Sequence, residues 1–326
     1  MCRTCLTPQP HPNRDELMTR HAGPSSAAPL SKMPPDGGRE PVGAGSYRFN
    51  CVGAFLSDED VNQLGVQSHG AIMPDGSICV LSRGKRQVSI WSPEGDLIQM
   101  WDPLPLSLAP HGIHVDVEGT IWIADAYQHV VLKYSPSGSL ISCIGVPYVP
   151  ALAHFGEPFN MPTGVATTPD GEIFVSDGYG NARIHRFDRS SRLLSSWGGR
   201  GTEAGMFAVP HFIEYEQGAD TLWVCDREND RIQIFTREGE FVTAISEFSY
   251  PNDIAFHGDA AVIAHKAGVS IIDKNSHDII CGWGHDAPYP GATRHPHGIF
   301  IDNAGDLYVT EAFGGCQTTK FERAAA

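Results

Sequence analysis

Apolar residues along this chain gather in short runs separated by turn-forming segments. Between residues 47 and 321, runs such as TIWIAD, EIFVSD and TLWVCD are rich in β-branched and aromatic residues, as expected of strands buried on both faces. Motifs such as PDG, PEG, PSG and REG separate the runs and predict hairpin turns. Since no segment has the pattern of a long helix, the sequence predicts an all-β protein.

A larger unit recurs within this pattern. Six copies begin with SHGAIMPDGSICVLSRG, PHGIHVDVEGTIWIADAY, PTGVATTPDGEIFVSDGY, PHFIEYEQGADTLWVCDRE, PNDIAFHGDAAVIAHKA and PHGIFIDNAGDLYVTEAF. The second residue of each copy, which we call its anchor, lies at position 69, 111, 163, 211, 252 or 297. Successive anchors are 42, 52, 48, 41 and 45 residues apart. A period of about 40 to 50 residues is typical of a four-stranded propeller blade. The repeats therefore predict a six-bladed β-propeller over residues 46–326.

The two ends of the repeat array differ from its middle. Residues 1–45 are rich in proline, serine, glycine and polar residues, a composition that favours a disordered tail. The segment YRFNCVGAF at 47–55 belongs to no copy, and the sixth copy lacks a final strand after TTKF. We therefore expect the N-terminal strand to complete the C-terminal blade and close the ring.

Charge and composition narrow the classes of partner. The chain has 326 residues and a formal net charge of -15, with acidic residues spread along its length, which argues against nucleic-acid binding. It contains no run of about 18 apolar residues and lacks the features of a secretory signal, so we expect a soluble cytoplasmic protein without a membrane partner. The oligomeric state stays open.

Cysteine usage agrees with a reducing compartment. Most of the cysteines beyond residue 50 lie in strand-like runs, which favours reduced core thiols over disulfides: Cys51, Cys79, Cys143, Cys225 and Cys281. Cys2 and Cys5 form a single CxxC without the second pair that a structural zinc site requires.

Candidate chemistry lies at the anchor positions. In a propeller the innermost strands begin beside the central channel, so equivalent anchors form a ring: His69, His111, Thr163, His211, Asn252 and His297. Three of the histidines, His111, His211 and His297, fall on alternate blades and so share an approximate threefold axis. Three converging imidazoles are typical of an open catalytic zinc site, although iron, cobalt or manganese also suit such a site.

Simpler interpretations of these histidines stay open. The three imidazoles can be buried side chains that bind backbone carbonyls. His69 can be a hydrogen-bond donor behind the ligands, an extra ligand, or part of the channel wall.

A second ring is expected from the loop after the second strand of each blade. It contains Arg83, Tyr127, Tyr179, Arg227, Lys266 and Phe313. The guanidinium fork of Arg83 or Arg227 suits an anionic substrate. A tyrosine serves as a general base when a cation and a metal-bound substrate stabilise its phenolate. The alternative is that these are ordinary loop residues, with Arg227 paired to Asp226 or Glu228.

The longer motifs resemble a known family. PHGIHVDVEGTIWIAD, MPTGVATTPDGEIFVSDGYGNARI, VPHFIEYEQGADTLWVCDRENDRIQIF and HPHGIFIDNAGDLYVTEAF are similar to the NHL-repeat propeller of peptidyl-α-hydroxyglycine α-amidating lyase, and the likeness extends over residues 47–321. The resemblance implies zinc on His111, His211 and His297, a base at Tyr179, and active-site arginines at Arg83 and Arg227. The implied reaction cleaves the N–C bond of a carbinolamide to an amide and glyoxylate.

Several positions depart from that family. The animal members place an aspartate directly after the third zinc histidine to bind a structural calcium, whereas this chain has Gly298, which argues against calcium. A methionine two positions before that histidine is replaced by His295. Cysteines that pair in the secreted relatives are replaced by Asn160, Gly180, Trp223 and Ile234.

Three functions remain after this comparison. The resemblance implies a lyase acting on a peptide or on a smaller anionic α-hydroxy-amide. The alternatives are another metal-dependent lyase or hydrolase with the same three histidines, and a propeller without enzymatic activity that binds a protein partner.

Overall fold

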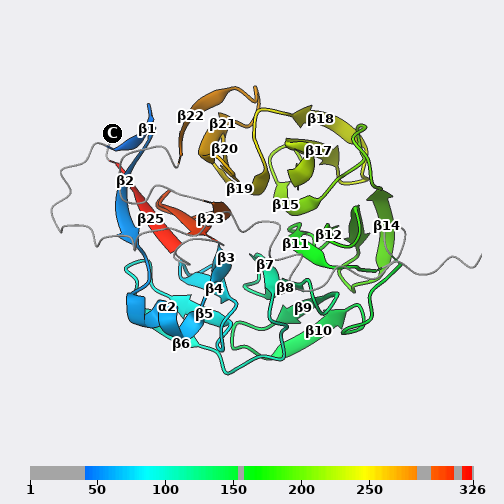
Figure 1. The fold of residues 1–326 in the computed structure, drawn as a ribbon, viewed down its shortest axis with the longest axis horizontal. Helices are drawn as coiled ribbons and strands as arrows, with labels where there is room; N and C mark the ends of the chain where they lie inside the picture. The colour runs from blue at the N-terminus through cyan, green and yellow to red at the C-terminus, as the bar shows by residue number, and fades with distance from the viewer. Residues whose placement is uncertain (1–40, 153–157, 285–294, 312–317, 325–326) are drawn as a thin grey trace, which may run out of the picture. The chain divides into compact units, whose positions relative to one another are not determined.

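A computed structural model describes residues 41–152, 158–284, 295–311 and 318–324 (Figure 1). Inter-residue contacts divide the chain into Met1–Ser31 and Lys32–Ala326, and every described residue belongs to the second unit. Within that unit six antiparallel sheets surround a common axis, which confirms the six-bladed β-propeller. No helix in the described ranges is long and apolar enough to cross a membrane.

The first five blades have four strands each, in sequence order from the axis outward. Blade 1 contains β3 (Gln67–Ile72), β4 (Ile78–Ser82), β5 (Val88–Trp91) and β6 (Leu97–Met100). Blade 2 contains β7 (Pro110–Val115), β8 (Ile121–Asp125), β9 (Val130–Tyr134) and β10 (Leu140–Ile144). Blade 3 contains β11 (Pro162–Thr167), β12 (Ile173–Asp177), β13 (Arg183–Phe187) and β14 (Leu193–Gly198). Blade 4 contains β15 (Pro210–Glu216), β16 (Thr221–Asp226), β17 (Arg231–Thr236) and β18 (Phe241–Ile245). Blade 5 contains β19 (Pro251–His257), β20 (Ala260–His265), β21 (Gly268–Asp273) and β22 (Ile279–Gly284).

The sixth blade is built from both ends of the propeller. Its strands are β23 (Pro296–Ile301), β24 (Leu307–Glu311) and β25 (Thr318–Arg323), followed outward by β2 (Tyr47–Ala54) and β1 (Val42–Ala44). Strand β2 pairs with β25, with Cys51 opposite Phe321, so the N-terminal strand closes the ring as the sequence predicted. Strand β1 begins within the range expected to be a tail, and residues 1–40 of that range lie outside the described residues.

Besides the strands, the described residues contain two short helices and apolar clusters between neighbouring sheets. Helix α2 (Asp58–Leu64) joins β2 to β3, and the 3-10 helix η1 (Arg227–Asn229) follows β16. Phe49 of β2 packs against Trp283 of β22, with ring centroids 5.7 Å apart. Among the described cysteines only Cys79 and Cys225 are buried, whereas Cys143 is exposed. The expectation of core thiols therefore holds for some of these cysteines only.

In each inner strand the register of pairing with the second strand shifts directly after the first paired residue. In β7 the register passes from Pro110 to Gly112, which leaves His111 unpaired as the extra residue of a bulge. The same bulge falls on the other anchors, but in β3 the register passes from Gln67 to His69, so the extra residue is Ser68. The sequence alignment that placed His69 in the ring was therefore wrong by one residue. Ser68 lies 43 positions before His111.

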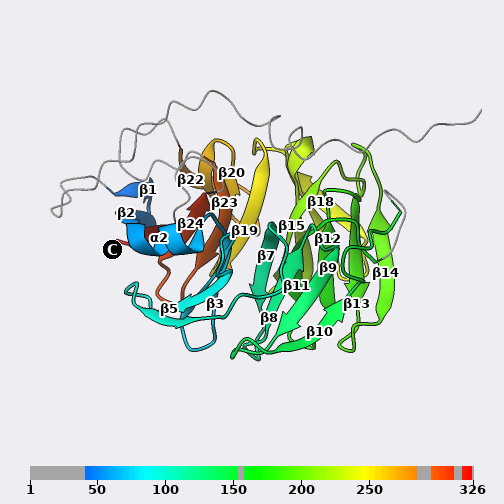
Figure 2. The same cartoon turned by 60° about the horizontal axis from the view of Figure 1, so that its bottom comes forward.

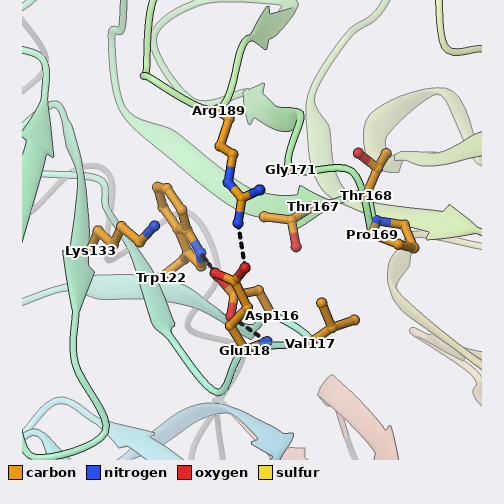
Figure 3. A pocket seen from close by; sticks show the side chains of 10 residues that line it. All are labelled: Asp116, Val117, Glu118, Trp122, Lys133, Thr167, Thr168, Pro169, Gly171 and Arg189. Atoms are coloured by element: carbon orange, nitrogen blue, oxygen red, sulfur yellow. Dashed lines mark hydrogen bonds and ion pairs between the residues drawn. The ribbon is translucent and has the colours of Figure 1, made fainter.

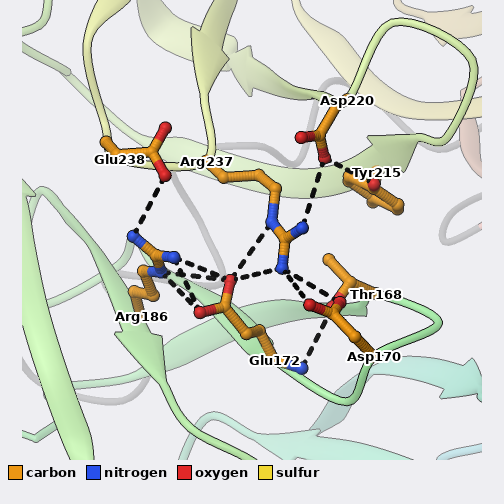
Figure 4. Close-up of polar contacts among 8 residues, drawn as sticks. All are labelled: Thr168, Asp170, Glu172, Arg186, Tyr215, Asp220, Arg237 and Glu238. Atoms are coloured by element: carbon orange, nitrogen blue, oxygen red, sulfur yellow. Dashed lines mark hydrogen bonds and ion pairs between the residues drawn. The ribbon is translucent and has the colours of Figure 1, made fainter.

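Ion pairs join neighbouring blades at the end of the sheets remote from the bulges. Arg189 of blade 3 binds Glu118 of blade 2 beside a small hollow, where Lys133 lies 4.6 Å above the Trp122 ring (Figure 3). Between blades 3 and 4, Arg237 binds Asp170 at 2.7 Å and Glu172 at 2.8 Å, and Arg186 binds Glu172 at 2.7 Å (Figure 4). These contacts clamp the blades where no candidate catalytic group lies.

Candidate functional site

The three predicted histidines meet at the axis. His111, His211 and His297 begin the inner strands of blades 2, 4 and 6, and their ring centroids lie 4.7, 4.9 and 5.1 Å apart. One nitrogen from each lies within 4.8 Å of the others, and among the described residues they form the one such group of metal-binding side chains. All three side chains are buried. The three histidines that the sequence places on alternate blades therefore lie next to one another at the axis.

Backbone carbonyls hold each imidazole in one orientation. His111 Nδ1 donates to Thr163 O at 2.7 Å, His211 Nδ1 to Asn252 O at 2.8 Å, and His297 Nδ1 to Ser68 O at 2.8 Å. Because a carbonyl only accepts, each Nδ1 carries the proton and each Nε2 presents a lone pair. The carbonyl contacts proposed as the simpler interpretation thus exist, and they orient the rings for ligation.

The intervening ring positions complete a circle of contacts between blades. Ser68 Oγ donates to His111 O at 2.7 Å, Thr163 Oγ1 to Pro210 O at 2.8 Å, and Asn252 Nδ2 to Pro296 O at 2.7 Å. Each histidine is therefore oriented by a carbonyl of the blade that follows it, and the residue that supplies this carbonyl donates in turn to a backbone carbonyl of the next blade. Sequence reasoning missed this role of Ser68, although the polar residues at alternate anchors were a usable signal.

The electrostatic environment keeps the imidazoles neutral. Burial lowers the pKa of His111, His211 and His297 well below the usual range. The Arg227 guanidinium lowers all three further, and the Arg83 guanidinium lowers those of His111 and His297. A neutral imidazole is the form that binds a metal ion. The donor set, tautomers and charge state of this cluster therefore fit a divalent metal.

Tyr179 lies directly against the histidines. Its hydroxyl is 2.9 Å from His111 Nε2 and 3.0 Å from His211 Nε2, and Arg227 Nη1 donates to it at 3.3 Å. The Arg227 guanidinium also lies over the rings of Tyr179 and Tyr250, at 5.3 and 5.6 Å from their centroids. A hydroxyl between two lone pairs and a cation is well placed to exchange a proton with a bound group.

The two predicted arginines have different surroundings. Arg227 Nη2 and Nε contact Glu228 at 2.5 and 3.1 Å, so the alternative pairing with Glu228 is correct, while Asp226 binds Arg231 instead. Burial disfavours the Arg227 cation, but Tyr179 and Glu228 more than offset this and raise its pKa above the ordinary value. Arg83 Nη2 donates to Ser68 Oγ at 3.0 Å, which places this second guanidinium beside the ring.

Buried aspartates at the ends of second strands hold the loops that carry Tyr179 and Arg227. Asp177 accepts from the backbone N–H of Asn160 and from Asn181 Nδ2, each at 2.9 Å. Asp226 accepts from Ala208 N at 2.9 Å and from Arg231 Nε at 2.8 Å. The recurrent aspartate that ends TIWIAD, EIFVSD and TLWVCD was the sequence signal for these supports.

Glycine 178 lets the Tyr179 loop approach blade 4. A Cβ atom at this position would lie 2.3 Å from Pro210 O, which is closer than atoms can pack. The glycine before Tyr179 therefore brings that loop close to the residue preceding His211.

His69 lies just beyond the ring and binds a different partner. Its Nε2 donates to Asp253 Oδ2 at 2.5 Å, and its ring stacks on Phe212 with centroids 4.7 Å apart. Burial raises the pKa of Asp253, and the contact with His69 counteracts this shift. A Cβ atom on Gly298 would lie 2.7 Å from His69 Cδ2, so His69 occupies the space that a longer residue at 298 would need.

The remaining candidates are exposed or lie outside the described residues. His295 is exposed just before β23, and Lys266 is exposed after β20. Tyr127 is 39% exposed, and no hydrogen bond between it and the three histidines is found among the described residues. Phe313 lies outside the described residues.

Comparisons with known proteins agree with this architecture. The NHL repeat family model matches residues 159–187. A stretch of 231 residues is 31% identical to "Peptidyl-alpha-hydroxyglycine alpha-amidating lyase 2" of Drosophila melanogaster and covers 65% of this chain and 54% of that protein. A stretch of 154 residues is 38% identical to "Peptidylglycine alpha-amidating monooxygenase" of Rattus norvegicus and covers 44% of this chain and 16% of the relative.

Solved structures support the fold. A streptogramin B lyase superposes with a TM-score of 0.61 at 15% sequence identity, over 86% of this chain and all of the other. The curated relatives above are longer than the matched region, since the chain spans about half or less of their length. The protein is thus a six-bladed β-propeller that contains an NHL repeat at residues 159–187 and resembles the peptidyl-α-hydroxyglycine α-amidating lyases in sequence.

Proposed function

We propose that this protein is a metal-dependent lyase that cleaves the carbon–nitrogen bond of an α-hydroxyglycine-type carbinolamide, releasing an amide and glyoxylate. The observation that carries the proposal is the Tyr179 hydroxyl, which is shared among His111 Nε2, His211 Nε2 and Arg227 Nη1. The names of the similar lyases support the same chemistry.

His111, His211 and His297 would hold the metal, for which zinc is the first candidate and another divalent ion the second. When bound, such an ion supplies a Lewis acid that makes a hydroxyl more acidic and neutralises developing negative charge. Calcium is not part of the proposal, because Gly298 offers no carboxylate and His69 fills the adjacent space.

The chain's own groups then account for the proton transfers. Tyr179 removes the proton from the substrate hydroxyl, and its neighbour Arg227 stabilises the phenolate. The oxygen electron pair forms the aldehyde C=O while the C–N bonding pair leaves on nitrogen. Tyr179 returns its proton to that nitrogen, so the amide and glyoxylate carry all the atoms of the substrate.

Arg83 is assigned to the substrate carboxylate. Arg227 already contacts Glu228 through two of its nitrogens and directs the third to Tyr179, which leaves little of its fork for a second carboxylate. Arg83 lies partly buried next to the ring, where it donates to the Ser68 hydroxyl, and a guanidinium suits a substrate carboxylate.

The proposal is tested with protein purified without chelator. We expect one equivalent of a divalent metal, lost in His111→Ala, and glyoxylate release from an N-acyl-α-hydroxyglycine. Tyr179→Phe should retain the metal and lower kcat by about 10²-fold or more, the usual contribution of a positioned general base. Tyr215→Phe, whose hydroxyl contacts Asp220 at the remote end of the sheets, is the control. Undiminished turnover in Tyr179→Phe would refute the assignment of the base, and a metal-free wild type would favour a binding propeller.

A further inference from the structure

The end of the axis beside the site, which we call the mouth, carries side chains of different polarity on different blades. The mouth is the end of the axis where the inner strands begin, and both the loops after second strands and the connections between blades open there (Figure 2). Its second ring presents Arg227 of blade 4, Lys266 of blade 5 and Arg83 of blade 1. The corresponding residues of blades 2 and 3 are the aromatic Tyr127 and Tyr179. Among the described residues the second ring is therefore cationic on blades 4, 5 and 1 and aromatic on blades 2 and 3, while the blade 6 position, Phe313, lies outside them.

Exposed apolar side chains extend the aromatic side. The connections that flank blade 2, together with its loop after β8, expose six large side chains, which we call the apolar rim: Leu108 (68%), Tyr127 (39%), Val146 (60%), Tyr148 (67%), Val149 (59%) and Leu152 (81%). In the described residues, the connections β14–β15 and β18–β19 expose no large apolar side chain. Single exposed apolar residues are ordinary, but a cluster on one side of a candidate site marks a binding surface.

Hydrogen bonds join the rim to the Tyr179 loop. Tyr148 N donates to Gln128 O at 2.9 Å, next to Tyr127, and Met161 N donates to His129 Nδ1 at 3.1 Å. Tyr179 N in turn donates to Met161 O at 3.3 Å. The Gln128 side chain also donates to Pro105 O at 2.5 Å, which ties the connection before Leu108 to the same loop. The rim is therefore continuous with the loop that carries the proposed base.

The rim contains a turn held in an unfavourable conformation. Val149 N donates to Val146 O at 3.0 Å, and Tyr148 has a φ of 63°, a region that bulky residues avoid. Its ring is nonetheless 67% exposed, so packing within the chain does not compensate for the strain. A strained residue that displays an aromatic ring beside a site is a feature of ligand-binding loops.

We propose that the apolar rim binds the acyl part of the substrate, and that this part is a linear apolar chain. The inference rests on the proposed lyase function and adds the class of substrate. With the substrate carboxylate at Arg83 and the substrate hydroxyl at Tyr179, the acyl group lies either along the blades with cationic residues or along the apolar rim. The hydrophobic effect favours contact of an apolar acyl chain with the apolar rim.

The rim's backbone favours an acyl chain over a peptide. Tyr148 N, Val149 N and Ala151 N already donate to Gln128 O, Val146 O and Phe159 O. An extended peptide needs partners for its own backbone N–H and C=O groups, whereas a hydrocarbon chain needs only contact area. The chemistry offered by the rim is therefore that of a fatty acyl substituent.

The test measures glyoxylate release from N-acetyl-, N-hexanoyl- and N-decanoyl-α-hydroxyglycine. A fully buried methylene gives about a fourfold gain, so on a surface that covers one side of the chain we expect about twofold per methylene. From acetyl to hexanoyl, which adds four methylenes, kcat/KM should rise about 16-fold. In the double variant Val149→Ser/Leu152→Ser this ratio should fall to about threefold or less. Val117→Ser is the control. Val117 is as exposed as Leu108 but lies at the remote end of the sheets, so this variant should keep the wild-type ratio of hexanoyl to acetyl kcat/KM.

Affinity for unreactive N-acylglycines of the same lengths, measured by calorimetry, provides a second readout. A wild type whose Kd falls with chain length, with the dependence lost in the double variant, supports the rim. Turnover of the acetyl compound without any chain-length preference would overturn the rim and leave the lyase function standing. Turnover of none of the compounds would overturn the lyase function, and the acyl subsite with it. A preference for apolar peptides over acyl chains would overturn the choice of ligand.

Discussion

Ser68→Ala tests whether the circle of contacts between blades supports the site. Ser68 is fully buried, and its hydroxyl donates to His111 O at 2.7 Å and accepts from Arg83 Nη2 at 3.0 Å. Removing a neutral buried hydrogen bond costs about 1 kcal/mol, and removing one to a charged group about 1.5–3 kcal/mol. We therefore expect a loss of about 2–4 kcal/mol in the free energy of unfolding. For a domain of this size that lowers Tm by about 4–8 °C.

The same substitution separates orientation of Arg83 from ligation of the metal. The Ser68 carbonyl that accepts from His297 Nδ1 stays in place in the alanine variant, so the three imidazoles keep their tautomers. The metal content should therefore equal that of the wild type. Arg83 loses one hydrogen-bond partner in the ring, so KM should rise about 10-fold while kcat changes less.

Ser82→Ala in the same blade is the matched control. Ser82 is equally buried in β4, but its hydroxyl has no hydrogen-bond partner among the described residues. Its removal should leave Tm within about 1 °C of the wild type, because no hydrogen bond is lost. Differential scanning calorimetry and steady-state glyoxylate assays provide both readouts. Equal Tm values for the two variants, or loss of metal in Ser68→Ala, would refute the reasoning.

Three further predictions concern the fold and its pH dependence. Burial, together with Asp253, raises the pKa of Glu214 from 4.5 to about 8, so stability should be highest below pH 4.5 with respect to this group and fall as pH rises toward 8, by up to about 1.4 kcal/mol per pH unit. Urea unfolding of Glu214→Gln should lack this fall, and parallel curves for the two proteins would contradict it. Phe49→Ala in the closing strand should cost about 3–5 kcal/mol, whereas Val52→Ala, exposed in the same strand, should cost little, so equal costs would argue against closure by β2. Arg237→Ala removes the contacts to Asp170 and Glu172 and should lower the free energy of unfolding by about 1–2 kcal/mol. The control Arg192→Ala, at an exposed ion pair, should lower it by less than about 0.5 kcal/mol. Equal shifts in Tm for the two variants would show that the ion pairs between blades 3 and 4 contribute nothing.

The sequence alone determined the blades and the alternate histidines. Strands and turns are encoded locally, by β-branched and aromatic runs and by glycine-containing turns, and repetition of the unit then counts the blades. His111, His211 and His297 follow directly, because each begins an inner strand after the same proline. Closure by residues 47–55 was also readable, since the sixth copy lacked a strand that the N-terminus could supply.

Only the tertiary structure decided which side chains meet across the axis. SHG and PHG look equivalent as motifs, but the bulge in β3 falls on Ser68, so His69 turns to Asp253 and the ring gains a serine. Tyr127 and Tyr179 occupy equivalent loops, yet only Tyr179 is hydrogen-bonded to the histidines in the described part of the chain. Register at a bulge and the approach of one loop to the next blade are set by packing between residues distant in sequence, and periodicity carries no information about either.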